Sequence, residues 1–345
     1  MHTLKYLLRH LFSVALFTFA LTALSYAQEH KSQDGQLKQL QENLKNDYFS
    51  FGLLVQGLAD FQPERMAGYN GFKASKGRFK ISGIFDNQFG YNLQATMLKS
   101  PSILDANVYY KPTVNFSIKG GIFKSPFTHE YLTGAGSILF ASRSTVVNQL
   151  GTKRQVGFQI DTYTSEKTFR FTGGIFNGNN YSGNSNDDNK FLYVGRIESY
   201  LGDDSNQTKL GVSIAHETKD APGAGNLSTG YIGKQTLLTT YASLTQNKLL
   251  LDGEFIHGWR NPDVGPDSNP YGYYFTAGYL VTDSSRLLIR WDAFEGDNLT
   301  QDTEQILVGF NHTPNSFTKL KLNYVLPTND SIEYSNFLAI LQVGF

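Results

Sequence analysis

From residue 48 to the last residue, apolar and polar side chains alternate with a period of two, and this alternation limits the possible fold more than any other feature. Around Leu93, for example, Asn92 and Gln94 are polar, whereas the residues two positions away are apolar or aromatic. Successive side chains of a strand point to opposite faces, so the period predicts β-strands. We expect about sixteen strands, over 48–60, 79–85, 91–97, 104–110, 116–122, 156–162, 169–175, 191–200, 210–214, 236–244, 249–257, 273–281, 287–293, 306–310, 320–325 and 337–345.

The segments between these strands alternate in length. The long segments cover 62–71, 125–153, 178–189, 217–234, 261–269 and 295–301, and most of the others are short turns. Bacterial membrane barrels have short periplasmic turns and longer extracellular loops, whereas a β-sandwich has no reason for this regularity. Hydrocarbon offers no hydrogen-bond partner, so a spanning sheet must close on itself. The sequence therefore predicts an all-β fold, a transmembrane antiparallel β-barrel of about sixteen strands over residues 47–345.

The N-terminal segment predicts export from the cytoplasm. Lys5 and Arg9 precede an uncharged apolar stretch over 11–24, and small residues stand at Ser25 and Ala27, the positions that a signal peptidase reads. The apolar stretch is short for a membrane span, so we expect a signal peptide over 1–27 rather than an uncleaved anchor. The polar segment 28–46 is expected to be a periplasmic tail or a short helix. Together with the barrel, this predicts the outer membrane of a Gram-negative-type bacterium.

The composition excludes several classes of protein. The chain has 30 basic and 30 acidic residues, without the basic surplus that is typical of a nucleic-acid binder. It has no cysteine, so neither disulfides nor thiol chemistry is expected. The seven histidines lack metal-binding spacing, and no catalytic motif accompanies them. We therefore expect no metal, no cofactor and no enzymatic activity.

One specific motif lies at the longest of the long segments. It consists of Gly121-Ile122-Phe123-Lys124-Ser125-Pro126-Phe127, then Glu130-Tyr131-Leu132-Thr133, and then Phe140, Arg143-Ser144 and Val146. This pattern resembles the G-x-F-K-x-P-F…E-x-L-T…F-x-x-R-S-x-V signature of the phosphate-selective porin O and P family. The resemblance implies a trimeric sixteen-stranded barrel whose third extracellular loop, here 125–153, folds inward to narrow a pore. The chain has no dense series of arginines of the kind that would form a phosphate ladder.

The face opposite the apolar side chains predicts a mildly basic interior. Its expected basic residues are Arg78, Lys80, Lys111, Lys119, Arg170, Arg196, Lys209, Arg290, Lys319 and Lys321, and its acidic residues are Asp105, Asp161, Glu198, Asp252, Glu254 and Asp292. Positive charge at a narrow passage lowers the barrier for anions. We predict that the anion path is lined by Lys119, Lys124, Arg143, Lys153, Arg154, Arg170, Arg196 and Arg290. For Arg143 the alternative is that it attaches the inward loop to the wall.

These features predict an outer-membrane porin for the passive diffusion of small anionic or neutral solutes, with a preference for anions such as phosphate. The alternatives are a non-selective diffusion porin, a structural or adhesin barrel, and a soluble secreted all-β protein. The apolar outer wall would contact outer-membrane lipid. The terminal Phe345 closes an alternating segment and resembles the ending that the barrel-assembly machinery recognises. The family resemblance implies a homotrimer.

Overall fold

The computed structural model describes residues 42, 48–65, 68–98, 100–180, 185–203, 206–220, 232–297 and 301–345. The signal peptide predicted over 1–27 lies outside the described residues. The polar segment 28–46 also lies outside them, apart from Glu42.

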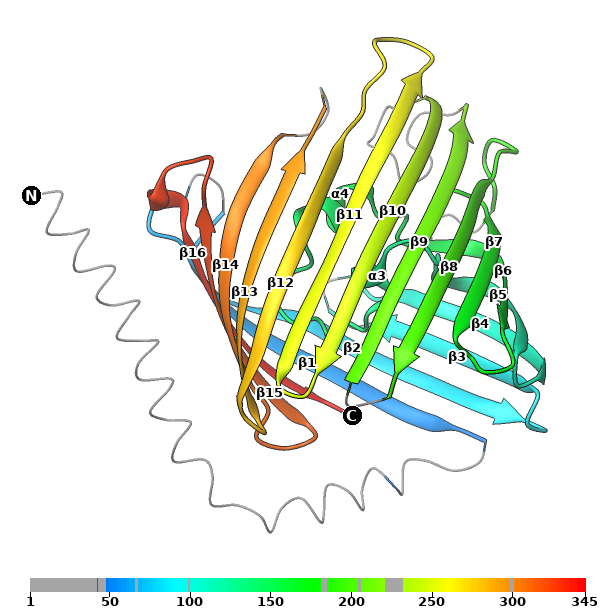
Figure 1. Cartoon of the computed structure of the whole chain (residues 1–345), viewed down its shortest axis with the longest axis horizontal. Coiled ribbons are helices and arrows are strands. Elements are labelled where there is room, and N and C mark those ends of the chain that lie inside the picture. Colours follow the sequence, from blue (N-terminus) through cyan, green and yellow to red (C-terminus); the bar gives the residue numbers. More distant parts are fainter. Residues whose placement is uncertain are drawn as a thin grey trace, which may run out of the picture.

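Sixteen antiparallel strands form one closed barrel, as the sequence predicted (Figure 1). The strands are β1 (Ser50–Phe61), β2 (Gly71–Phe85), β3 (Phe89–Thr96), β4 (Ser102–Thr113), β5 (Phe116–Lys124), β6 (Arg154–Tyr163), β7 (Phe169–Phe176), β8 (Leu192–Gly202), β9 (Asn206–Lys219), β10 (Gly233–Gln246), β11 (Leu249–Pro262), β12 (Tyr271–Thr282), β13 (Ser285–Glu295), β14 (Thr303–His312), β15 (Thr318–Pro327) and β16 (Asn336–Gly344). Each strand pairs with its neighbour in the chain, and β1 pairs with β16 to close the sheet. Closure gives every strand edge a hydrogen-bonding partner.

Three short helices complete the described elements. α3 (His129–Leu132) and α4 (Thr145–Leu150) belong to the connection between β5 and β6, and the 3-10 helix η2 (Ile332–Tyr334) precedes β16. Within the described residues, no helix is both long enough and apolar enough to cross a bilayer.

The two faces of the barrel wall differ in the way that the period of two predicts. On β8, the outward-facing side chains of Tyr193 and Ile197 are 52% and 46% exposed, whereas the inward-facing Arg196 and Glu198 are 3% and 5% exposed. Similar apolar side chains are exposed on the outside of most other strands. An apolar outer band matches hydrocarbon, while polar and charged groups face the interior.

The connections alternate in length around the barrel. One end carries the short connections 86–88, 114–115, 164–168, 203–205, 247–248, 283–284 and 313–317. The other end carries 62–70, 97–101, 125–153, 177–191, 220–232, 263–270, 296–302 and 328–335. The predicted alternation is therefore confirmed, with the short connection 97–101 as its exception. The connection 125–153 is the third and longest at its end of the barrel.

Gly121 lies at a point where β5 comes very close to β4. Its φ is +122°, and a Cβ atom there would lie 2.2 Å from the carbonyl oxygen of Ala106. We expect Gly121→Ala to destabilise the pairing of β5 with β4 by at least about 1–3 kcal/mol, so that less protein reaches the heat-modifiable folded form on a gel. Gly173→Ala on β7 is the matched control, because a Cβ atom there meets nothing within 4 Å. Equal folded yields for the two variants would contradict this prediction.

Candidate functional site

The connection 125–153, called the constriction loop below, packs against the inner wall of the barrel. Its helix α4 contacts β11, β12 and β13, and both helices lie within the outline of the barrel (Figure 1). Phe127 and Val146 of this loop are completely buried. The loop therefore occupies part of the lumen at the level where its side chains meet the wall.

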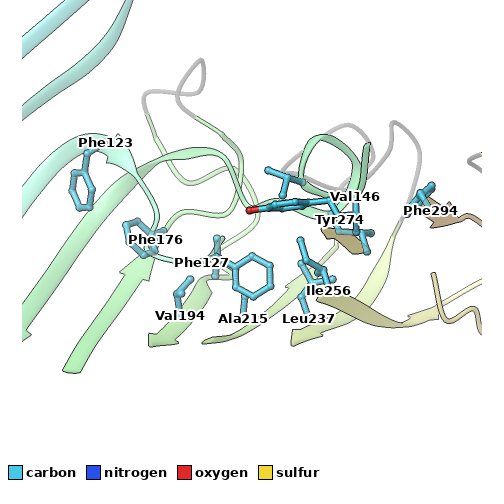
Figure 2. Packing of buried hydrophobic residues seen from close by; sticks show 13 residues of the cluster. Phe123, Phe127, Val146, Phe176, Val194, Ala215, Leu237, Ile256, Tyr274 and Phe294 are labelled. Atoms are coloured by element: carbon cyan, nitrogen blue, oxygen red, sulfur yellow. The ribbon is translucent and has the colours of Figure 1, made fainter. Parts of the chain in front are cut away.

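An apolar cluster joins the constriction loop to one half of the wall (Figure 2). The cluster comprises Phe123, Phe127, Val146, Val147, Leu150, Phe176, Leu192, Val194, Ala215, Leu237, Ile256, Tyr274 and Phe294. Its wall members come from β5, which contributes Phe123, and from β7 to β13, and they face inward, where a water-filled barrel is expected to be polar. The alternating pattern of the sequence did not predict this cluster. The available signal was the run 192–194, in which both faces of a strand are apolar or aromatic.

Carboxylates of the wall bind the N-termini of both loop helices. The two carboxylate oxygens of Glu254 accept hydrogen bonds from the backbone N–H groups of His129, at 2.7 Å, and Glu130, at 3.1 Å. Asp292 accepts the backbone N–H of Thr145 at 2.9 Å. The first N–H groups of a helix have no partner inside the helix, so these carboxylates satisfy them. The acidic side of the wall is thereby occupied by the loop.

Glu130 connects the two loop helices to the wall. Its Oε1 forms a salt bridge with Nη2 of Arg290 at 2.8 Å, and its Oε2 accepts the backbone N–H of Ser144 at 2.7 Å. The Arg290 guanidinium lies between the rings of Phe140 and Tyr274, at 4.6 and 4.5 Å from their centroids. Arg290 is only 1% exposed. Its charge is therefore used to hold the loop.

The middle of the constriction loop crosses to β15 and β16. Lys321 donates to the carbonyl oxygen of Ile138, and Lys319 donates to that of Gly136 at 3.3 Å. The amide of Gln342 donates to the same Gly136 oxygen at 3.1 Å. The loop is thus attached to the wall at β11 to β13 and again at β15 and β16. The space beside it, called the passage below, contains cavities that are lined mainly by residues of β1 to β7.

Four of the eight predicted path residues stand beside carboxylates. The pairs are Arg154 with Asp105 at 3.0 Å, Arg170 with Asp161 at 2.6 Å, Arg196 with Glu198 at 2.7 Å, and Arg290 with Glu130 at 2.8 Å. Arg196 also donates to the carbonyl oxygen of Phe127 at 2.6 Å and so holds the loop as well. The charges of these arginines are balanced locally.

Lys124 and Arg143 meet at the C-terminal end of α3. Nζ of Lys124 donates to the carbonyl oxygens of Leu132 and Thr133 at 3.1 and 2.9 Å, and Nη2 of Arg143 donates to Thr133 at 2.9 Å. Arg143 therefore binds the backbone of its own loop. Burial lowers the pKa of Arg143 from its ordinary value, and the nearby Glu130 opposes this shift.

The last two predicted path residues occupy different places. Nζ of Lys119 on β5 lies 4.2 Å from the centroid of the Phe123 ring. Lys153 has a φ of +55°, and its carbonyl oxygen accepts the backbone N–H of Ser125 at 3.0 Å, which joins the two ends of the constriction loop. Burial lowers the pKa of the Lys153 ammonium. In the described part of the chain, no salt bridge joins Lys119, Lys124, Arg143 or Lys153 to a carboxylate.

A row of cations on β2 faces the loop from the other side of the passage. Lys76, Arg78 and Lys80 occupy successive inward positions, and no salt bridge is formed by them within the described residues. Lys76 and Arg78 both lie within electrostatic range of Arg143. The alternating pattern placed Arg78 and Lys80 in the lumen, but the strand expected over 79–85 did not extend back to Lys76. β2 begins earlier, at Gly71, so Lys76 lies on the strand and shares the inward face of Arg78 and Lys80.

A cavity of about 530 Å³, called the basic hollow below, lies between the loop and the wall. Its basic lining residues are Arg78, Lys80, Lys124, Arg154 and Lys319. Among the described residues, no aspartate or glutamate lines it. Across the same described ranges, no group of three or more histidine or acidic side chains is arranged to hold a metal ion.

Comparison with known proteins gives one family. The family model for the phosphate-selective porins O and P matches residues 69–260, which is more than half of the chain. A comparison with curated proteins finds no match.

Solved outer-membrane proteins share the fold. The anion-selective porin from Comamonas acidovorans is 13% identical with a TM-score of 0.67, covering 86% of this chain and 99% of that chain. OmpT of Vibrio cholerae is 12% identical with a TM-score of 0.61, covering 88% and 99%, and it has also been solved in a trimer form. The channel DcaP of Acinetobacter baumannii is 12% identical with a TM-score of 0.62, covering 86% and 97%. At these identities the similarity establishes the fold alone.

Proposed function

Because the chain belongs to the phosphate-selective porin O and P family, we propose that it is a passive outer-membrane channel that passes small anions more readily than cations. The family and the closed sixteen-stranded fold support an outer-membrane porin. A barrel of this size is too wide for its wall side chains alone to fill it. The constriction loop fills part of the lumen, and the passage beside it would conduct.

One difference between the charged side chains supports the anion preference. The carboxylates named below are bound to the loop or to an arginine, whereas two cations on β2 form no salt bridge within the described residues. Glu254, Asp292 and Glu130 are bound to the loop or to an arginine. By contrast, Arg78 and Lys80 form no salt bridge within the described residues. Unbalanced positive charge beside a low-dielectric wall attracts anions and repels cations. We therefore assign the anion path to Lys76, Arg78, Lys80, Lys124 and Arg143, and a bracing role to the four carboxylate-paired arginines.

Planar-bilayer recording of the purified channel tests this function. In a tenfold gradient of potassium chloride, we expect the zero-current potential to have the sign set by chloride, with a permeability ratio of chloride to potassium of about ten. A zero-current potential near zero would support a non-selective diffusion porin instead. A potential on the potassium side, or the absence of any current, would contradict the proposal.

The processing and assembly of the chain are also proposals. We propose cleavage after Ala27 and assembly into a homotrimer, with no enzymatic activity and no cofactor. The backbone of the terminal Phe345 exchanges two hydrogen bonds of 3.1 Å with Leu53, so it continues the closing strand pair, and it would also be available to the barrel-assembly machinery during insertion. The N-terminal residue of the purified protein and its mass on a native gel check the first two points.

A further inference from the structure

The basic hollow has cations on one side and apolar side chains on another. Its apolar lining comes from Leu54 on β1, Ala135 in the constriction loop, and Phe317 and Phe345 at the end of the barrel that carries the short connections. The rings of Phe317 and Phe345 lie edge to face, with their centroids 6.4 Å apart. Water forms no hydrogen bonds with an apolar lining. A cavity that is lined by cations and also by apolar side chains is typical of a site for an amphiphilic ligand.

Two of the five cations that line the hollow are available to an anionic ligand. Arg154 is paired with Asp105, and Lys124 and Lys319 donate to carbonyl oxygens of the loop. Arg78 and Lys80, adjacent inward positions on β2, form no salt bridge in the described part of the chain. A guanidinium and an ammonium side by side match one carboxylate group, which accepts hydrogen bonds from both.

Leu54 is an apolar residue of the hollow that does not belong to the lipid-facing surface of β1. It stands on the inward face of β1, two positions from Gln56, whose side-chain amide donates to the side-chain oxygen of Gln342. Leu54 is only partly buried, although its outward neighbours Leu53 and Val55 already supply the lipid-facing surface. The loop passes close by, because a Cβ atom on Gly136 would lie 3.3 Å from Cδ1 of Leu54.

We propose that the basic hollow is a subsite for monocarboxylates that carry a short apolar tail, with the carboxylate at Arg78 and Lys80 and the tail against Leu54 and Phe317. This proposal rests on the proposed anion channel and names the substrate class of that channel. The volume of about 530 Å³ falls in the range of small-molecule sites. Inorganic phosphate would bind the cations but would bury no apolar surface.

The test is the block of chloride current by added anions in planar bilayers containing the purified, processed chain. Hexanoate is expected to halve the current at a concentration about tenfold lower than acetate, because only hexanoate buries apolar surface. Inorganic phosphate is expected to resemble acetate in this respect. Equal half-blocking concentrations for hexanoate and acetate would overturn the proposal, and this comparison needs no variant.

Two variants assign the effect to the hollow. Leu54→Ser is expected to remove most of the advantage of hexanoate over acetate, while Leu58→Ser, at another inward position of β1 outside the hollow, should leave it unchanged. Loss of the advantage in both variants, or in neither, would contradict the assignment.

The anion-channel proposal and the subsite proposal can fail separately. Potassium preference in the unmodified channel would overturn the anion channel, whereas chloride preference with equal block by both carboxylates would overturn only the subsite.

Discussion

Reversing two charges on β2, in the double variant Arg78→Glu with Lys80→Glu, is expected to move the zero-current potential of the channel from the chloride side to the potassium side. Both residues line the basic hollow, and neither forms a salt bridge among the described residues. The reversal changes the local charge by four units without removing the partner of a buried group. We expect the permeability ratio of chloride to potassium to fall by at least about tenfold.

The control for this experiment is Lys248→Glu in the exposed turn between β10 and β11. A charge there is surrounded by solvent and screened within about 8–10 Å at physiological ionic strength. The zero-current potential of the Lys248→Glu variant should therefore equal that of the unmodified channel. An unchanged potential in the β2 double variant would contradict the assignment of Arg78 and Lys80 to the conduction path.

The second large effect concerns the attachment of the constriction loop. Glu130→Gln leaves the buried guanidinium of Arg290 without its salt-bridge partner, which costs about 3–5 kcal/mol in comparable sites. Asp292 lies within electrostatic range of Arg290, so we expect the lower end of that range. The barrel should lose its compact gel migration at a lower temperature, and single-channel conductance should rise as the loop leaves the wall.

A second variant distinguishes the loss of the ion pair from a general loss of packing. Combining Glu130→Gln with Arg290→Met removes both charges and is expected to restore much of the thermal resistance, because a neutral pair of similar volume leaves no buried charge without a partner. Glu166→Gln in the exposed turn between β6 and β7 serves as the matched control and should behave like the unmodified protein. If Glu130→Gln melts and conducts like this control, the salt bridge does not hold the loop.

Both experiments depend on a difference between two sides of the inner wall. On the side of β7 to β13, carboxylates and apolar side chains bind the constriction loop. On the side of β1 to β6, cations face the passage and only Arg154 has a carboxylate partner among those lining the basic hollow. A loop that packs on an acidic wall thus leaves a basic surface for solute.

Much of the fold was determined by the sequence alone. The alternation of apolar and polar residues, as around Leu93, determined the strands, because side chains two positions apart on a strand share a face. The lengths of the connections determined the antiparallel order and the place of the longest loop. The motif from Gly121 to Val146 indicated the family, which the match over residues 69–260 confirms.

The partners of the charged residues were decided only by the tertiary structure. A period of two indicates which residues of a strand face inward, but it does not indicate which strands the constriction loop covers. Arg290 was predicted to line the path, yet the loop brings Glu130 to it from a distant part of the chain. Lys76 was missed because β2 begins at Gly71, earlier than the strand expected from residue 79. The Glu130–Arg290 contact joins segments far apart in the sequence, and the length of β2 depends on its pairing with β1; local alternation encodes neither.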